Sequence, residues 1–285
     1  MKALVIGGTG TTGSRVVRSL LKRGVEVSVM TRSAEKVVNG ARMVIGDLRD
    51  PNTSELAFRG IDLVFMLVAA GVSETYEGVL GVLLGERAKV RRFVYMSSQK
   101  IDLTPTLIFG GATKLPIENA LELSGIAYTI LRPNSFYQND IWYKTALLDH
   151  GVYPQPFGLK GMQRVDVADI AEVAAVALTE AGHEGRTYNL VGPEIQTGPS
   201  IAESWSRALG RKIVYGGDDL DVFENSHAFM GPQLVFPYRL LFDWYQKHGL
   251  HGSPEDLEMM TRLLRRPPRS HASFAKEMAK EWTIS

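Results

Sequence analysis

A short run of glycines and threonines has the spacing of a phosphate-binding turn. Residues 7–13 read Gly-Gly-Thr-Gly-Thr-Thr-Gly and follow an apolar stretch at 2–6 that predicts a buried strand. The next segment, 14–22, places its apolar side chains on one stripe and its basic ones away from it, which predicts a helix. Glycines let the backbone approach a pyrophosphate, and the first N–H groups of the helix attract that anion. This order predicts a dinucleotide-binding site; the alternative is a glycine turn without a ligand.

A basic residue follows the second predicted strand, which covers 25–30. Proteins that bind NAD usually have an acidic residue there, which holds the ribose hydroxyls. Here the residue is Arg32, whose guanidinium can hold a 2′-phosphate through paired, charge-assisted hydrogen bonds. Lys36 adds a second positive charge nearby. The position predicts NADP(H) in preference to NAD(H); the alternative is that Arg32 is a solvated loop residue.

Composition narrows the class of protein. The chain has 285 residues, 45% hydrophobic and 22% charged, which is enough for one large domain or a domain with a smaller lobe. A net charge of +1 gives no electrostatic footprint for nucleic acid or a membrane. The absence of cysteine excludes disulfides and thiolate chemistry and agrees with a cytoplasmic location. The histidines show no metal-ligand spacing, so we expect no metal. We expect a small-molecule substrate, and the sequence leaves open whether the protein is a monomer or a dimer.

Short apolar runs alternate with helical patterns along the chain. This alternation is typical of an α/β protein, and we predict a Rossmann-type doubly wound parallel sheet. The predicted strands cover 2–6, 25–30, 42–45, 62–67, 92–96, 126–131 and 186–191. Ligands of such sheets bind beyond the carboxyl ends of the strands. The residues expected to converge there are Gly7, Arg32, Asp47, Ala69, Ser97 and Pro133.

We expect the dinucleotide-binding domain at 1–194 and a smaller, mostly helical substrate lobe at 195–285, either separate from the first domain or interleaved with it. A helix at 200–209 and a strand at 212–215 are predicted within the lobe. Aromatic residues then gather between 229 and 245. They would either wall a pocket for a flat apolar substrate or pack in the core, and core packing is the commoner arrangement.

The chain resembles the NmrA-like family of atypical short-chain dehydrogenase/reductases. The resemblance rests on the segments 7–13, 46–48, 92–98, 114–118, 128–136 and 164–171. It implies a Rossmann fold that binds NADP(H). The cofactor contacts that it implies are Gly7, Thr9, Gly10, Thr11, Thr12, Gly13, Arg32, Asp47, Leu48, Val68, Ala69, Ser97, Lys114, Pro133 and Phe136. In the same segments, Asp166 and Asp169 are expected to cap or position a helix.

The catalytic positions depart from the parent superfamily, in which a tyrosine four residues before a lysine donates a proton. Lys114 is present, but the residue four before it is Gly110, preceded by Phe109. The usual general acid is therefore missing. In one alternative, hydride transfer needs little or no side-chain acid, and Lys114 and water are sufficient. In the other, a tyrosine from a loop replaces the missing acid: Tyr137 after the sixth predicted strand, or Tyr76 after the fourth.

Each of these side chains has an alternative role. The two tyrosines would otherwise be packing residues. Lys114 would otherwise be a solvated helix residue paired with Glu118.

The family resemblance leaves two functions open. We predict an NADPH-dependent reductase that transfers hydride to a small, apolar or aromatic quinone, enone or imine. The alternative is a non-catalytic NADP(H) sensor that acts through a protein partner. Gly110 and Arg32 together disfavour a sugar-nucleotide epimerase.

Overall fold

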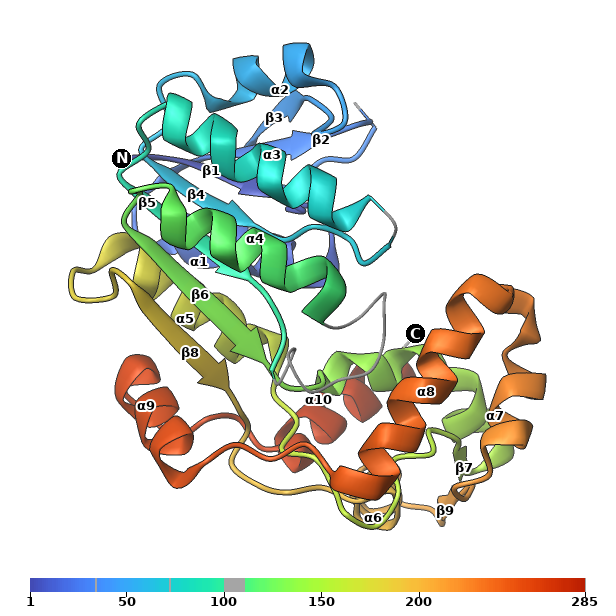
Figure 1. The fold of residues 1–285 in the computed structure, drawn as a ribbon. Helices are drawn as coiled ribbons and strands as arrows, with labels where there is room; N and C mark the ends of the chain where they lie inside the picture. Colours follow the sequence, from blue (N-terminus) through green and yellow to red (C-terminus); the bar gives the residue numbers. More distant parts are fainter. Residues whose placement is uncertain (34, 72, 100–110, 285) are drawn as a thin grey trace. The chain divides into compact units, whose positions relative to one another are not determined.

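The computed structural model describes residues 1–33, 35–71, 73–99 and 111–284 (Figure 1). They form two compact units that alternate along the chain. Unit 1 contains the described residues up to Pro133 together with Val167–Asn189, and unit 2 contains Asn134–Asp166 and the described residues from Leu190 onward. A substrate-binding role for the residues after 194 stays a prediction.

A seven-stranded sheet forms the centre of unit 1, in the order β3-β2-β1-β4-β5-β6-β8. Its strands are β1 (Lys2–Ile6), β2 (Glu26–Thr31), β3 (Arg42–Ile45), β4 (Leu63–Met66), β5 (Arg92–Met96), β6 (Tyr128–Pro133) and β8 (Arg186–Leu190). The pairs from β3 to β6 are all parallel. The predicted Rossmann-type sheet is confirmed, and the strand order reverses between β1 and β4.

Helices cover both faces of this sheet. On one face lie α2 (Pro51–Phe58), α3 (Glu74–Arg87) and α4 (Gly111–Leu123); on the other lie α1 (Thr11–Lys22) and α5 (Val167–Thr179) (Figure 1). Because both faces are covered, the central strands are apolar along nearly their whole length, and every residue of β4 is buried. This explains why the sequence shows continuous apolar runs instead of alternating ones.

A glycine lets α3 and α4 approach each other closely. A Cβ atom at Gly78 would lie 2.3 Å from Cδ1 of Ile117, so any larger side chain would push the helices apart. Near the amino ends of the same helices, the Thr75 hydroxyl donates to the carbonyl of Thr113 at 3.0 Å. These contacts bring the first turns of α3 and α4 together.

Unit 2 is mostly helical. Its elements are η1 (Tyr137–Tyr143), η2 (Ala146–His150), β7 (Val152–Tyr153), α6 (Gly198–Leu209), β9 (Val214–Tyr215), α7 (Leu220–Ser226), η3 (Ala228–Met230), α8 (Pro232–His248), α9 (Pro254–Leu264) and α10 (His271–Ile284). The predicted helix at 200–209 and strand at 212–215 correspond to α6 and β9. None of the helices in the described ranges is long and apolar enough to cross a membrane.

The aromatic residues between 229 and 245 divide into two groups. Phe242 is buried and packs against Phe157 and Phe223, with ring centroids 5.5 Å and 4.8 Å away. Phe229 and Phe236 are 84% and 53% exposed. For the buried group, the core-packing role is therefore the one observed.

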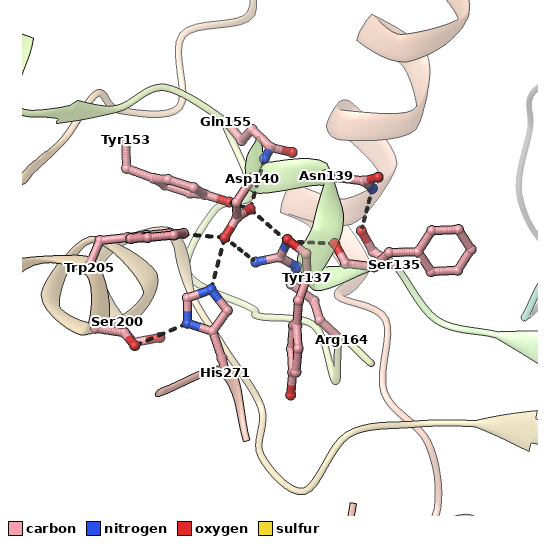
Figure 2. Close-up of polar contacts among 12 residues, drawn as sticks. Ser135, Tyr137, Asn139, Asp140, Tyr153, Gln155, Arg164, Ser200, Trp205 and His271 are labelled. Carbon is pink, nitrogen blue, oxygen red and sulfur yellow. Dashed lines mark hydrogen bonds and ion pairs between the residues drawn. The ribbon is translucent and has the colours of Figure 1, made fainter. Parts of the chain in front are cut away.

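A fully buried carboxylate organises the polar centre of unit 2 (Figure 2). Asp140 accepts hydrogen bonds from five side chains that lie far apart in the sequence. The donors are Tyr153 Oη (3.0 Å), Gln155 Nε2 (3.1 Å), Arg164 Nη2 (2.7 Å), Trp205 Nε1 (3.0 Å) and His271 Nε2 (2.8 Å). Such a network joins η1, β7, α6 and α10 around one charge.

The side chains around Asp140 compensate the cost of burying its negative charge. Burial opposes ionisation of Asp140, but Arg164 and His271 outweigh it and hold the pKa of Asp140 below its usual value. Burial lowers the pKa of His271, although Asp140 acts in the opposite direction. The bonds fit a neutral imidazole whose Nε2 donates to Asp140 and whose Nδ1, at 3.0 Å, accepts from the Ser204 hydroxyl.

The lowered pKa of His271 makes stability depend on pH. The unfolded chain binds a proton near pH 6.5 and the folded chain does so only at lower pH, so acidification favours unfolding. At pH values below 6.5, we expect the free energy of unfolding to decrease by up to about 1.4 kcal/mol per pH unit. Urea unfolding between pH 7.5 and 5.5 measures this slope.

The substitution His271→Gln keeps a donor for Asp140 but does not titrate, so it should flatten the slope. Burial also lowers the pKa of His183, so His183 accounts for any pH dependence of the free energy of unfolding that remains in the variant. The exposed His150→Gln is the control and should keep the wild-type profile. An unchanged slope in His271→Gln would contradict this account.

Candidate dinucleotide-binding site

The glycine run forms a tight turn between β1 and α1. Gly7 has φ +80°, a conformation that favours glycine, and its carbonyl accepts from the N–H of Gly10 at 3.1 Å. A Cβ atom at Gly13 would lie 2.2 Å from the same carbonyl oxygen. The turn therefore packs backbone directly against backbone, and only glycine fits at position 13.

The amino end of α1 presents N–H groups without a side-chain cap. Its N-cap residue is Gly10, and the first turn contains no acidic residue. The first N–H groups of a helix have no partner within it, and the helix dipole makes them attractive to an anion. This end of α1 fits the pyrophosphate of a dinucleotide, as the glycine spacing predicts.

The turn lies at the point where the strand order reverses. A Cβ atom at Gly7 would lie 2.5 Å from the carbonyl oxygen of Leu67, so the ends of β1 and β4 are in contact there. In an open parallel sheet this crevice is where ligands bind. Of the residues predicted just after β4, Val68 is buried and Ala69 is exposed.

The predicted 2′-phosphate site lies beyond β2 and β3. Arg32 follows β2 and is exposed, and Asp47 follows the neighbouring β3. Arg49, which sequence analysis missed, holds Asp47 through Nε at 3.1 Å and Nη2 at 2.6 Å. The hydrogen bonds of Arg49, with a smaller contribution from Arg32, lower the pKa of Asp47 to about 2. Lys36 is exposed in a segment without a helix.

Lys114 is buried, and its Nζ forms an ion pair with Glu74 from α3. The alternative in which Lys114 pairs with Glu118 along α4 is wrong. Glu118 instead accepts from Nε of Arg132, in β6, at 3.1 Å. The sequence offered no signal for the pairing with Glu74, because the two residues are 40 positions apart.

The two tyrosines proposed as substitutes for the missing acid differ in setting. Tyr137 is 0% exposed within unit 2, and its hydroxyl donates to the carbonyl of Arg269 at 3.3 Å, which favours the packing alternative. Its role as an acid stays a prediction, as does the cofactor contact of Phe136, also in unit 2. The placement of Tyr76 in a loop was wrong, because it lies in the first turn of α3 and is 55% exposed. Gly110 and Phe109 lie outside the described residues.

The remaining predicted residues have structural contacts. Ser97 is buried after β5, and its N–H donates to the carbonyl of Leu131. Asp166 precedes α5, accepts from Gln138 Nε2 at 2.8 Å and forms an ion pair with Arg269 Nε at 3.1 Å. No group of three or more histidine, aspartate or glutamate side chains in the described parts of the chain is placed to hold a metal.

The glycine turn, the uncapped amino end of α1 and the reversal of strand order define a dinucleotide-binding protein of the Rossmann class. A family model described as NAD(P)H-binding matches residues 7–181. The chain belongs to this family.

Three known proteins illustrate the range of its relatives. The chain is 30% identical to the NAD(P)H azoreductase of Xenophilus azovorans, over 97% of both chains. It is similar in fold to the NADPH complex of quinone oxidoreductase QOR2 from Escherichia coli, with TM-score 0.84 and 24% identity over 98% and 99% of the chains. It is also similar to NmrA, a negative transcriptional regulator solved with NADP, with TM-score 0.80 and 16% identity over 99% and 96%.

These likenesses bear on the predictions made from sequence. The predicted membership of an NAD(P)H-binding family is confirmed, and the chain shares its fold with NmrA, as the NmrA-like resemblance implies. The prediction of an NADP-dependent oxidoreductase agrees with the full-length relative, which is an NAD(P)H azoreductase.

Two glycine substitutions should separate folding from cofactor binding. Gly13→Ala forces a methyl group against the Gly7 carbonyl and should destabilise the fold by about 1–3 kcal/mol. At Gly10 the backbone is extended, and the nearest atom to an added Cβ is 3.4 Å away, so Gly10→Ala should keep its stability. It should still weaken NADPH binding, because the second glycine of the motif admits the pyrophosphate. Urea unfolding and calorimetric titration measure the two effects; equal behaviour of the variants would contradict the assignment.

Proposed function

We propose that the protein is an NADPH-dependent reductase that transfers hydride to a small apolar or aromatic acceptor of the azo, quinone, enone or imine type. The observation that carries the proposal is the full-length likeness to an NAD(P)H azoreductase in a chain with an intact glycine turn. The close backbone contact between Gly13 and Gly7 starts α1 directly after the turn, and the uncapped amino end of that helix fits a bound pyrophosphate.

The proposed acceptors suit a site without a tyrosine acid. When bound, NADPH supplies a hydride, which adds to an electron-poor carbon, nitrogen or quinone ring of the acceptor. The negative charge that develops on the partner atom needs a nearby cation and a proton. Lys114 supplies the cation, and water supplies the proton, so neither Gly110 nor Phe109 has to act.

A non-catalytic sensor is the second candidate. It is favoured by the similarity in fold to a regulator that binds NADP and by the burial of Tyr137, which leaves the usual acid unreplaced. Such a protein would bind both oxidation states of the cofactor and consume neither.

We place the protein in the cytoplasm, in agreement with a sequence that contains no cysteine. We assign it no nucleic-acid or membrane partner, because its net charge is only +1. It acts as a monomer or a dimer in this proposal.

Turnover against an acceptor panel decides between the two candidates. We expect NADPH to be consumed with at least one azo dye, quinone, enone or cyclic imine, as followed by the loss of absorbance at the nicotinamide band. Gly10→Ala, which should keep its stability but bind NADPH more weakly, is the control for cofactor-dependent turnover. Tight NADPH binding with no consumption across the panel would favour the sensor, and no binding of either cofactor would refute both candidates.

Removing the guanidinium beyond β2 tests the choice of cofactor. Arg32→Ala should weaken NADPH binding by about 10-fold or more, since a hydrogen bond to a charged group contributes about 1.5–3 kcal/mol. Binding of NADH, which lacks the 2′-phosphate, serves as the internal control and should change little. Equal losses for the two cofactors would show that Arg32 does not read the 2′-phosphate.

A further inference from the structure

Glu74 is a fully buried carboxylate that the family resemblance did not bring to attention. One of its oxygens is bound by the Nζ of Lys114, and the other, Oε2, has no hydrogen-bond partner among the described residues. A buried charge is costly unless it is paired and hydrogen-bonded. A carboxylate kept in such a place, with one oxygen still free, indicates a task beyond holding the fold together.

The packing of α3 on α4 builds this ion pair. Gly78, one turn after Glu74, is the point where Ile117 of α4 comes too close for any side chain on α3. The hydrogen bond from Thr75 to the Thr113 carbonyl fixes the same two helix ends. Glu74 and Lys114 therefore meet because two separate contacts close to them set the distance between the helices.

Two further hydroxyls lie buried at the end of β5. Tyr95 and Ser97 are two residues apart and therefore point to the same face of the sheet. Neither hydroxyl has a partner among the described residues. Burial raises the pKa of Tyr95 well above its usual value, and the charges of Glu74 and Glu118 raise it further. Tyr95 thus stays protonated, and its raised pKa makes it a poor proton donor, so it does not replace the missing acid.

The neighbouring charges leave Glu74 as the counter-ion of Lys114. Glu118 lies on the same helix as Lys114 but is held by the guanidinium of Arg132. An ammonium group has three donors, and Glu74 uses one of them. No other acceptor in the described parts of the chain binds the Lys114 ammonium, which leaves two donors for a ligand.

We propose that Glu74 is a positioning residue, whose buried carboxylate anchors Lys114 so that its two remaining donors are directed to the ribose hydroxyls of the nicotinamide half of NADPH. In this chain Gly110 replaces the tyrosine that would otherwise stand beside the lysine, so the counter-ion fixes the lysine instead. The inference rests on the proposed function, since it assumes that Lys114 contacts the cofactor.

The test compares NADPH binding with stability in matched variants. Glu74→Gln keeps the shape of the side chain and removes its charge; Glu86→Gln, on the exposed side of the same helix, is the control. We expect Glu74→Gln to raise the dissociation constant of NADPH roughly 10-fold and the control to leave it unchanged. A variant that loses stability but binds NADPH like the wild type would overturn the proposal.

A double-variant cycle shows whether Glu74 acts through Lys114. In a Lys114→Met background, Glu74→Gln should have no further effect on NADPH binding, because its target is gone. An equal loss with and without Lys114 would overturn the proposal. If Glu74→Gln alone does not fold, the apolar pair Glu74→Leu with Lys114→Met provides a folded reference, since apolar replacement of a buried ion pair is tolerated. That reference should bind NADPH as weakly as Lys114→Met, and binding like the wild type would overturn the proposal.

The wild-type titration separates this inference from the proposed function. Failure of the wild type to bind NADPH would refute the function itself. Normal binding by both the wild type and Glu74→Gln would refute only the role of Glu74.

Discussion

The contact between the backbone of Gly7 and that of Gly13 is the constraint on which the candidate site depends. It forces the chain to turn immediately after β1 and starts α1 with its N–H groups uncapped at the end of the sheet. The same turn touches the end of β4, where the strand order reverses. One steric requirement thus places the turn, the helix end and the crevice of the sheet together, which explains why the motif is recognisable from the sequence alone.

Both units bury ionised groups, and they neutralise them in different ways. In unit 2, five donors surround Asp140, so the carboxylate is saturated and holds segments that are distant in sequence. In unit 1, Glu74 is bound by Lys114 through one oxygen only. Both oxygens of the Asp140 carboxylate are hydrogen-bonded, whereas Oε2 of Glu74 still has the capacity to accept a hydrogen bond.

Local patterns predicted the sheet well because buried parallel strands read as continuous apolar runs. The predicted strands 2–6, 42–45 and 92–96 have the observed bounds. The same reasoning erred where a partner comes from another element. Lys114 was compared only with Glu118, its neighbour on the helix, and Tyr76 was assigned to a loop although it lies in the first turn of α3. Spacing along one element contains no information about the element that packs against it.

The sequence by itself determined the dinucleotide-binding turn, the parallel sheet and the basic residue beyond β2, because each depends on neighbouring residues and on strand and helix periods. It also predicted that Gly110 stands where the parent superfamily has a tyrosine. Only the tertiary structure decided which charges meet: Lys114 with Glu74, Arg132 with Glu118, and Asp140 with Arg164 and His271. These pairs join residues 14 to 131 positions apart, and the packing of helices and strands, which the sequence pattern does not specify, brings them within reach.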